Sequence, residues 1–313
     1  TRMVERNGKF PTGLLDHVKR AISLRLQKDY EVTDHREAPA RGPRLPTPDL
    51  FDFQREAVDA FLNASRGVIN LPPRSGKTRI ALATICELNV PTIYLVPTVG
   101  IAKQTAKVVG DHLSPFGKET MALTGGLSSI SAKRHRQILR ADVLIATPQT
   151  AAKIPNLAAR QMLIVDEFHH SAAKTWQEVS RLACGAYWRM GLTGTHFRAD
   201  GKDMEMTGVL ARAVYKRTVD EMVAVGRLVP AKIAMVRVHG PRIESGGYDL
   251  YRDGIVAHDQ RNQTLTYAAK LLAHHGKRVL VLTKEVGHAH ALAAEIPGAV
   301  AVDGTDNDNV DAQ

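Results

Sequence analysis

A short loop between an apolar run and a helical pattern carries residue types that can hold phosphate. Residues 69–85 read INLPPRSGKTRIALATI, and Ser75, Gly76, Lys77 and Thr78 stand where the helical pattern begins. Main-chain N–H groups at such a junction point toward a bound phosphate group. Lys77 would neutralise the β and γ phosphates of a nucleotide, and the Thr78 hydroxyl would hold Mg²⁺.

The loop departs from the full phosphate-loop pattern at two places. Leu71 stands where the pattern has its first glycine, and Arg74 stands where many such loops use glycine. A bare Gly-Lys-Thr triplet is common by chance, so residues 74–78 are candidate nucleotide contacts that need support from a second element.

A pair of acidic residues is the candidate for that second element. Asp166 and Glu167 follow an apolar run, and His169 and His170 come shortly after them. Ligands of α/β sheets bind at the carboxyl ends of the strands. Asp166 would hold Mg²⁺ through its water shell, and Glu167 would orient and deprotonate the attacking water. The alternative is a carboxylate pair on a solvated loop. The histidine spacing fits no zinc template.

Short apolar runs that alternate with helical patterns must position these residues. Such runs, separated by helices, are typical of a parallel sheet that is covered on both faces. The predicted strands of the first series are 67–70, 91–97, 141–147, 161–167 and 186–195. A second, shorter series follows residue 228, with predicted strands at 231–238, 278–283 and 299–302 and helices at 261–275 and 286–295. The sequence therefore predicts an α/β fold with two domains in tandem.

The domain boundaries follow from composition. Residues 1–46 are expected to form a small N-terminal domain with an amphipathic helix, a strand at 30–35 and the start of a proline-rich linker. Residues 47–227 are expected to form the nucleotide-binding domain. Residues 228–313 are expected to form a second, partial domain of the same kind.

Charge and apolar content limit the class of protein. The net charge is +10 with a pI near 9.7, and the densest basic cluster is AKRHRQILR at 132–140. This balance favours a polyanionic partner such as nucleic acid. No apolar run approaches the roughly 20 residues of a membrane helix, and the first residues lack a signal-peptide core. Cys86 and Cys184 are expected to be buried free thiols, with a disulfide between them as the alternative.

Six segments together resemble a known family. LPPRSGKT, LVPTVGIAKQ, TGG, IATPQT, VDEFHH and GLTGTHFRADG occur in the order and spacing of superfamily 2 helicases and translocases. The resemblance is nearest to the DExH-type DNA motors, which include UvsW-like phage helicases and the motor subunits of restriction enzymes. It implies tandem RecA-like parallel-sheet domains, the second incomplete, with a small N-terminal α+β domain.

The resemblance also implies a role for individual residues. Gln54 would read the adenine base edge, and His169 would couple hydrolysis to movement. Thr193, Gly194 and Thr195 would link the ATP site to the strand site. The residues implied to contact the nucleic-acid backbone are Thr98, Gln104, Thr124, Gly125, Gly126 and Thr147. Such contacts, from hydroxyl and main-chain N–H groups, position a strand without reading its sequence.

The late arginine motif of the family is not found in this sequence. No Gln-x-x-Gly-Arg-x-x-Arg pattern occurs in it, and the residues after 228 supply only part of a RecA-like domain. We therefore expect a further chain or C-terminal region to complete that domain, and weak hydrolysis of ATP by these residues alone. Arg74 is a candidate substitute for the missing arginine.

The resemblance implies an ATP-dependent DNA helicase or translocase that acts on single-stranded or branched duplex DNA. Alternatives are the motor subunit of an ATP-dependent restriction system, an RNA helicase, and a non-catalytic ATP-gated DNA-binding subunit. No nuclease signature is visible, which disfavours a nuclease on this chain. The expected location is the cytoplasm of a bacterial or phage-infected cell, with no membrane partner.

Overall fold

The computed structural model describes residues 10–125, 131–167, 174–194, 203–239 and 251–303. The chain divides into two compact units, residues 1–230 and residues 231–313, and each is described here by itself. The prediction of three domains with boundaries at 46 and 227 stays a prediction.

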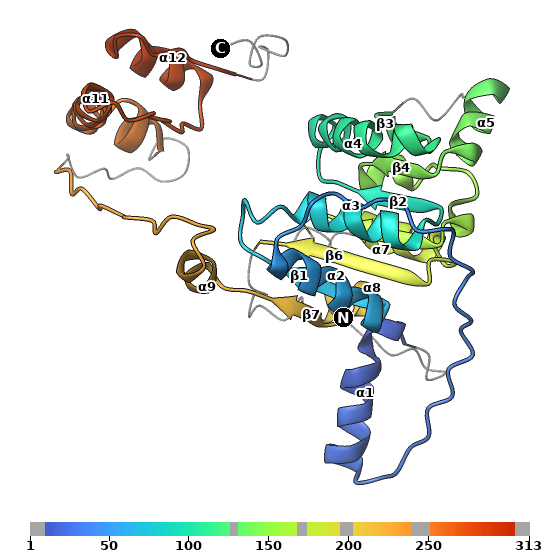
Figure 1. Cartoon of the computed structure of the whole chain (residues 1–313). Coiled ribbons are helices and arrows are strands. Elements are labelled where there is room, and N and C mark those ends of the chain that lie inside the picture. The colour runs from blue at the N-terminus through green and yellow to red at the C-terminus, as the bar shows by residue number, and fades with distance from the viewer. Residues whose placement is uncertain (1–9, 126–130, 168–173, 195–202, 240–250, 304–313) are drawn as a thin grey trace. The chain divides into compact units, whose positions relative to one another are not determined.

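Seven parallel strands form one sheet in the first unit, in the order β3-β4-β2-β5-β6-β1-β7 (Figure 1). The strands are β1 (Arg66–Asn70), β2 (Thr92–Leu95), β3 (Thr120–Leu123), β4 (Val143–Ala146), β5 (Met162–Val165), β6 (Trp188–Thr193) and β7 (Ala213–Lys216). The α/β fold with a parallel sheet is confirmed, and the five strands predicted for this unit are all present.

The described helices of the first unit precede β1, connect consecutive strands or follow β7. They are η1 (Thr12–Leu14), α1 (Leu15–Ala21), η2 (Ile22–Leu26), α2 (Asp52–Ala64), α3 (Lys77–Leu88), α4 (Val99–Leu113), η3 (Ser114–Phe116), α5 (Ala132–Arg140), α6 (Pro148–Ala151), η5 (Leu157–Ala159), α7 (Lys174–Leu182), α8 (Asp203–Leu210) and α9 (Val219–Ala224).

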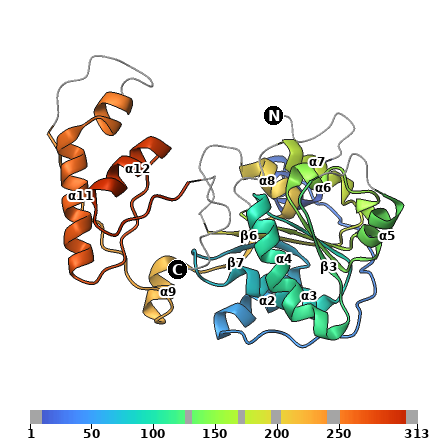
Figure 2. The ribbon, with the colours of Figure 1, turned by 90° about the horizontal axis from the view of Figure 1, so that it is seen from above.

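Alternate residues of each strand face two separate apolar cores. On β5, Met162 and Ile164 pack with α2, α3 and α4, whereas Leu163 and Val165 pack with α5, α6 and α7. Figure 2 shows these helices on opposite faces of the sheet. Burial on both faces explains why the central strands read as continuous apolar runs rather than as alternating patterns.

Buried arginines fix two of the covering helices at their C-terminal ends. The Arg189 guanidinium donates to the carbonyls of Ser180, Ala183 and Ala186, where α7 ends. Burial lowers the Arg189 pKa to about 10. Arg160 in the same way donates to main-chain carbonyls at the end of α5. Helix C-termini leave carbonyl groups without intrahelical donors, so each guanidinium satisfies groups that would otherwise be buried unpaired.

The segment before α2 contains no helix or strand between residues 27 and 50, so the strand predicted at 30–35 is wrong. The proline-rich part nevertheless packs on the sheet domain. Leu45 N donates to Cys86 O over 3.0 Å, Asn89 Nδ2 donates to Pro43 O over 2.8 Å, and Arg44 pairs with Glu87. The expected amphipathic helix is present at 12–26 as η1, α1 and η2.

The two cysteines differ from the expectation in one respect. Both are free, and burial raises the pKa of the Cys86 thiol on α3 to about 11. Cys184 is exposed rather than buried. It lies in the turn between the end of α7 and β6, where the chain passes over the surface.

The described part of the second unit contains helices and no strand. The helices are η7 (Arg252–Val256), α11 (Asp259–His274) and α12 (Val286–Glu295). The strands predicted at 231–238, 278–283 and 299–302 are wrong for this structure. Their side chains remain open to solvent, with Ile233 88% and Leu280 82% exposed. An apolar run becomes a strand only when a neighbouring strand accepts its hydrogen bonds, and these runs have none among the described residues.

Candidate nucleotide site and nucleic-acid edge

The carboxyl edge of the sheet gathers the predicted site residues in two groups. Because all strands are parallel, their carboxyl ends meet at the same edge. The candidate phosphate loop, residues 71–78, follows β1, Asp166 follows β5, and Thr193 ends β6, and these three strands are adjacent. Thr98, Thr124 and Thr147 follow β2, β3 and β4, which form the other side of the sheet. The strand order therefore separates the candidate nucleotide contacts from the candidate nucleic-acid contacts.

The phosphate loop turns through two left-handed residues before α3 begins. Gly76 has φ 76° and Arg74 has φ 65°. A Cβ at Gly76 would collide with Gln54 Nε2, so this position requires glycine for space as well as for conformation. The turn directs the first N–H groups of α3, including those of Lys77 and Thr78, toward the carboxyl edge. Such groups have no intrahelical acceptor and suit an anion.

Two side chains of the loop have unused hydrogen-bonding capacity among the described residues. Ser75 Oγ is buried and has no hydrogen-bond partner among the described residues. Within the described ranges, Lys77 Nζ donates one hydrogen bond, a long one of 3.4 Å to Leu71 O. A Cβ at Gly194, across the edge, would come within 3.3 Å of Lys77 Nζ, so a glycine there keeps the loop open. These features fit a phosphate group. Pro73 and Arg74 are exposed, so the loop leaves Arg74 at the surface.

Gln54 lies on α2 and supports the loop directly. Its side chain is 2% exposed, its Oε1 accepts from Phe51 N over 3.1 Å, and its Nε2 donates to Ser75 O over 2.9 Å. Each amide atom still has a second lone pair or a second proton. Gln54 therefore holds the phosphate loop in this structure, and base reading by its remaining capacity stays a prediction.

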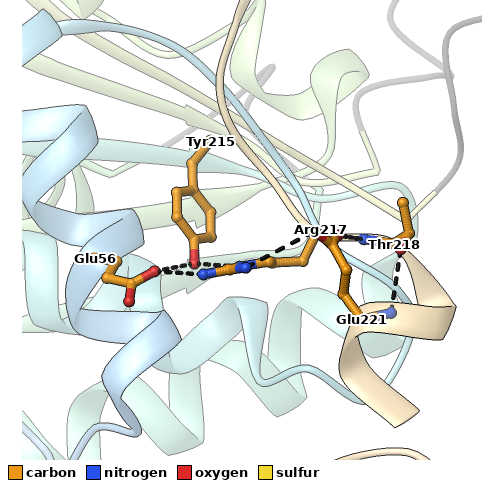
Figure 3. Close-up of polar contacts among 5 residues, drawn as sticks. All are labelled: Glu56, Tyr215, Arg217, Thr218 and Glu221. Atoms are coloured by element: carbon orange, nitrogen blue, oxygen red, sulfur yellow. Dashed lines mark hydrogen bonds and ion pairs between the residues drawn. The ribbon is translucent and has the colours of Figure 1, made fainter. Parts of the chain in front are cut away.

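A polar cluster fixes the helix that carries Gln54. Glu56 on α2 accepts from the Tyr215 hydroxyl over 2.7 Å and from Arg217 Nη2 over 2.9 Å (Figure 3). The Tyr215 hydrogen bond, and then that of Arg217, lower the Glu56 pKa. Thr218 and Glu221 cap α9 reciprocally beside this cluster. Sequence reasoning missed the cluster, although the Thr-x-x-Glu pattern at 218–221 is a recognisable helix start.

The acidic pair lies where β5 ends. Glu167 has φ 47°, and its N–H donates to Asp166 Oδ1 over 2.9 Å. Burial raises the Asp166 pKa to about 6, and the negative charge of Glu167 adds to the rise, while the Glu167 N–H and the Lys77 charge oppose it. A nearby cation would stabilise the ionised form of this carboxyl group and lower its pKa.

Tyr94 on β2 is buried near Asp166, and the sequence analysis did not identify it. Burial, and then the nearby Asp166 charge, raise the Tyr94 pKa well above its ordinary value. Its hydroxyl makes no hydrogen bond of ordinary geometry with a described residue, although it lies near the Thr78 and Asp166 side chains. The sequence feature that could have indicated it is a single tyrosine in the apolar run PTIYLVP at 91–97.

Thr78 and Asp166 supply the hydroxyl and the carboxylate that suit Mg²⁺. No three His, Cys, Asp or Glu side chains gather to hold a metal ion in the ranges that the structure describes. This fits an ion that keeps water and nucleotide oxygens in its shell. Bound Mg²⁺ would neutralise charge on the transferring phosphoryl group.

Asp166→Asn is expected to stabilise the protein in metal-free buffer at neutral pH. The amide keeps an oxygen for the Glu167 N–H and removes the buried charge. A rise in pKa from 3.8 to about 6 corresponds to about 3 kcal/mol at about 1.4 kcal/mol per unit. Because folding raises the Asp166 pKa, ionisation of this carboxyl group destabilises the folded wild type. This loss of stability is absent below the pKa of the unfolded chain, grows as the pH rises toward 6 and is complete above it.

Thermal unfolding with a chelator, at acidic and at neutral pH, measures this difference. The gain in Tm of Asp166→Asn should be small at the acidic pH and large at the neutral pH. A gain that does not depend on pH would contradict the assignment of the penalty to this carboxyl group.

The coupling residues lie next to the phosphate loop as far as they are described. Thr193 is buried, and its carbonyl accepts from Leu71 N over 3.0 Å, which ties the end of β6 to the start of the loop. Gly194 faces Lys77 and Pro73. His169, Thr195 and Gly126 lie outside the described residues. The link between the two sites stays a prediction.

The candidate nucleic-acid contacts differ in exposure. Thr98 Oγ1 caps α4 by accepting from Ile101 N over 3.3 Å, and Gln104 is exposed on that helix. Thr124 and Gly125 are exposed after β3. Thr147 precedes α6, is 7% exposed, and donates to Thr150 Oγ1 over 3.2 Å. Thus four of these residues are exposed at the edge, and Thr147 is buried.

Parallel-sheet topology and this edge define a RecA-like nucleotide-binding module. Residues 47–198 match the family model described as type III restriction enzyme, res subunit. A DNA 3'-5' translocase XPB2 of Sulfurisphaera tokodaii is 30% identical over 198 residues, which cover 63% of this chain and 42% of the relative. The ATP-dependent DNA helicase uvsW of Enterobacteria phage T4 is 23% identical over 251 residues, 77% of this chain and 49% of the relative.

The solved structures agree on the fold. The crystal structure of the UvsW helicase from bacteriophage T4 matches with a TM-score of 0.57 at 18% identity, over 69% of this chain and 82% of that one. These matches relate the chain to the superfamily 2 helicases, among them UvsW-like and restriction-motor proteins. It spans about half the length of the curated relatives that it matches. No described helix has the length and apolar character needed to cross a membrane.

Proposed function

We propose that this chain is the ATP-binding part of a DNA helicase or translocase that remodels duplex or branched DNA. The division of the carboxyl edge carries the proposal. ATP and Mg²⁺ would occupy the β5-β6-β1 side, and a DNA strand would lie along the β3-β4-β2 side. A shared edge lets a change at one ligand move the residues that hold the other.

In this proposal each residue of the nucleotide side has a defined task. Lys77 and the first N–H groups of α3 bind the β and γ phosphates, Thr78 and Asp166 hold Mg²⁺, and Glu167 takes the proton of the attacking water. Thr193 and Gly194 transmit the change toward the strand side. Such a motor would work in the cytoplasm, where its DNA is found. Arginines from further sequence or a partner chain remain an expectation.

Two other functions are kept as alternatives. The match of residues 47–198 to the restriction-enzyme res subunit favours the motor of a restriction system. A non-catalytic ATP-gated DNA-binding subunit is the other alternative, and the experiment below separates it from a motor. RNA in place of DNA is an outcome that the experiment distinguishes.

Steady-state ATP hydrolysis, measured with and without DNA, tests the proposal. We expect hydrolysis that rises on addition of single-stranded or branched DNA and less on addition of RNA. Binding of both ATP and DNA with no hydrolysis under any condition would favour the gated binding subunit. Stronger stimulation by RNA would replace the DNA motor by an RNA motor.

A further inference from the structure

Helix α5 carries an unbalanced set of cations. Its nine residues include Lys133, Arg134, Arg136 and Arg140 and no acidic residue. All four side chains are exposed, and none forms an ion pair in the part of the chain that the structure describes. Only Ile138 of the helix is fully buried. The outward surface of α5 is therefore a concentrated positive patch.

This arrangement of charges lowers the stability of the helix. Lys133 and Arg136, and then Arg136 and Arg140, are like charges three and four residues apart, and each such pair destabilises a helix by about 0.2–0.5 kcal/mol. Lys133 and Arg134 also stand in the first turn, where the helix dipole favours acids. Such a charge pattern is compensated when a polyanion lies along the helix.

Hydrogen bonds hold both ends of α5 despite this cost. Ser131 Oγ caps its start by accepting from Arg134 N over 3.2 Å. At its other end, the buried Arg160 donates to Ala141 O over 2.5 Å and to Ile138 O over 2.6 Å. Burial lowers the Arg160 pKa. A buried guanidinium thus anchors the end of a helix whose own cations all face solvent.

The position of α5 connects it with the proposed DNA edge. It joins β3 to β4, so it starts from the carboxyl edge, where Thr124 and Thr147 lie, and runs back toward the start of β4. Figure 1 shows it beside these two strands, at the end of the sheet opposite β7. A strand held along the β3-β4-β2 side would bring the DNA next to it close to α5.

We propose that the exposed face of α5 binds the phosphate backbone of duplex DNA adjoining the strand at the carboxyl edge. This inference rests on the proposed function and names the DNA form that the surface recognises. Sites for single strands combine cations with aromatic rings on which bases stack. α5 presents cations and no Phe, Tyr or Trp, which suits a duplex whose bases stay stacked inside.

The test compares two triple variants of the full chain that lose the same charge. One is Lys133→Gln, Arg136→Gln, Arg140→Gln on α5, because glutamine keeps a good helix propensity. The control is Lys270→Gln, Lys277→Gln, Arg278→Gln, which removes exposed cations of the second unit. Binding to a blunt duplex, and to one of its strands alone, is measured over a range of salt concentrations.

The α5 variant should bind the duplex at least about tenfold more weakly and lose about 2 to 3 from the slope of log K against log salt, because each phosphate contact contributes about 0.9. Its affinity for the single strand should stay that of the wild type. Its Tm should be equal or higher, since the like-charge repulsion is removed. The control should lose less than the α5 variant on duplex.

A wild-type slope on duplex for the α5 variant would overturn the inference, as would an equal loss on single strand or an equal loss in the control. Failure of the wild type to bind duplex would overturn it too. The proposed function is tested separately, by DNA-stimulated ATP hydrolysis of the wild type. If the wild type shows DNA-stimulated hydrolysis and the α5 variant keeps its duplex affinity, the proposed function stands and the DNA-binding role of α5 is wrong.

Discussion

Replacing Lys77 by alanine is expected to abolish ATP hydrolysis and to weaken nucleotide binding. The ammonium group is the cation that the phosphate loop presents to the β and γ phosphates. Among the described residues it donates one hydrogen bond, a long one of 3.4 Å to Leu71 O, which a nucleotide phosphate can replace. Truncation removes that charge and leaves the turn at Gly76 intact.

Arg79→Ala is the matched control for this variant. Arg79 is an exposed cation in the first turn of the same helix, and its replacement removes the same charge without touching the loop. We expect near-wild-type hydrolysis from the control and an unchanged Tm for both variants. Wild-type hydrolysis by Lys77→Ala would show that residues 69–78 do not form a phosphate loop.

The sheet was predictable where strands are buried on both faces. Runs such as PTIYLVP and QMLIVDE have no polar side, and they became β2 and β5. The strands β3 and β7 were missed because they are the outermost strands, and only one of their residues, Leu123, is fully buried. A short half-exposed strand lacks the continuous apolar run on which the prediction depended.

The site was predictable as a set of strand ends but not as a geometry. Glycine, lysine and threonine after one strand, and two acids after another, indicate the chemistry because parallel strands end at one edge. The adjacency of β1, β6 and β5 depends on strand order, which a single sequence does not contain. The hydrogen bond from Gln54 to Ser75 O and the position of Tyr94 near Asp166 likewise depend on packing between distant segments.

The second unit shows where apolar pattern alone fails. The runs at 278–283 and 299–302 contain the valines and leucines of a buried strand, yet in this structure they line a groove of about 540 Å³ beside α11 and α12. A strand needs hydrogen-bonded neighbours as well as apolar side chains. The apolar pattern alone could not predict that these runs have no neighbouring strand among the described residues, and their side chains are therefore largely exposed.

Glu167→Gln is expected to bind ATP and Mg²⁺ like the wild type and to hydrolyse ATP about 100-fold more slowly, because a positioned general base contributes at least that much. Glutamine has the same shape and the same Cβ, so the left-handed backbone at φ 47° is equally strained in both proteins. It can still orient a water molecule by accepting a hydrogen bond. It cannot take the proton of that water.

Single-turnover hydrolysis and binding of a fluorescent ATP analogue separate these two effects. Glu178→Gln removes an exposed acid from α7 and serves as the control for the loss of one negative charge. We expect the control to match the wild type in both measurements. If Glu167→Gln instead loses nucleotide binding, Glu167 shapes the site and the base that activates water must be another group. If binding is kept, only turnover falls and the charge control is unaffected, the carboxylate after Asp166 acts on the reacting water, because glutamine keeps the shape of the side chain and loses its ability to accept a proton.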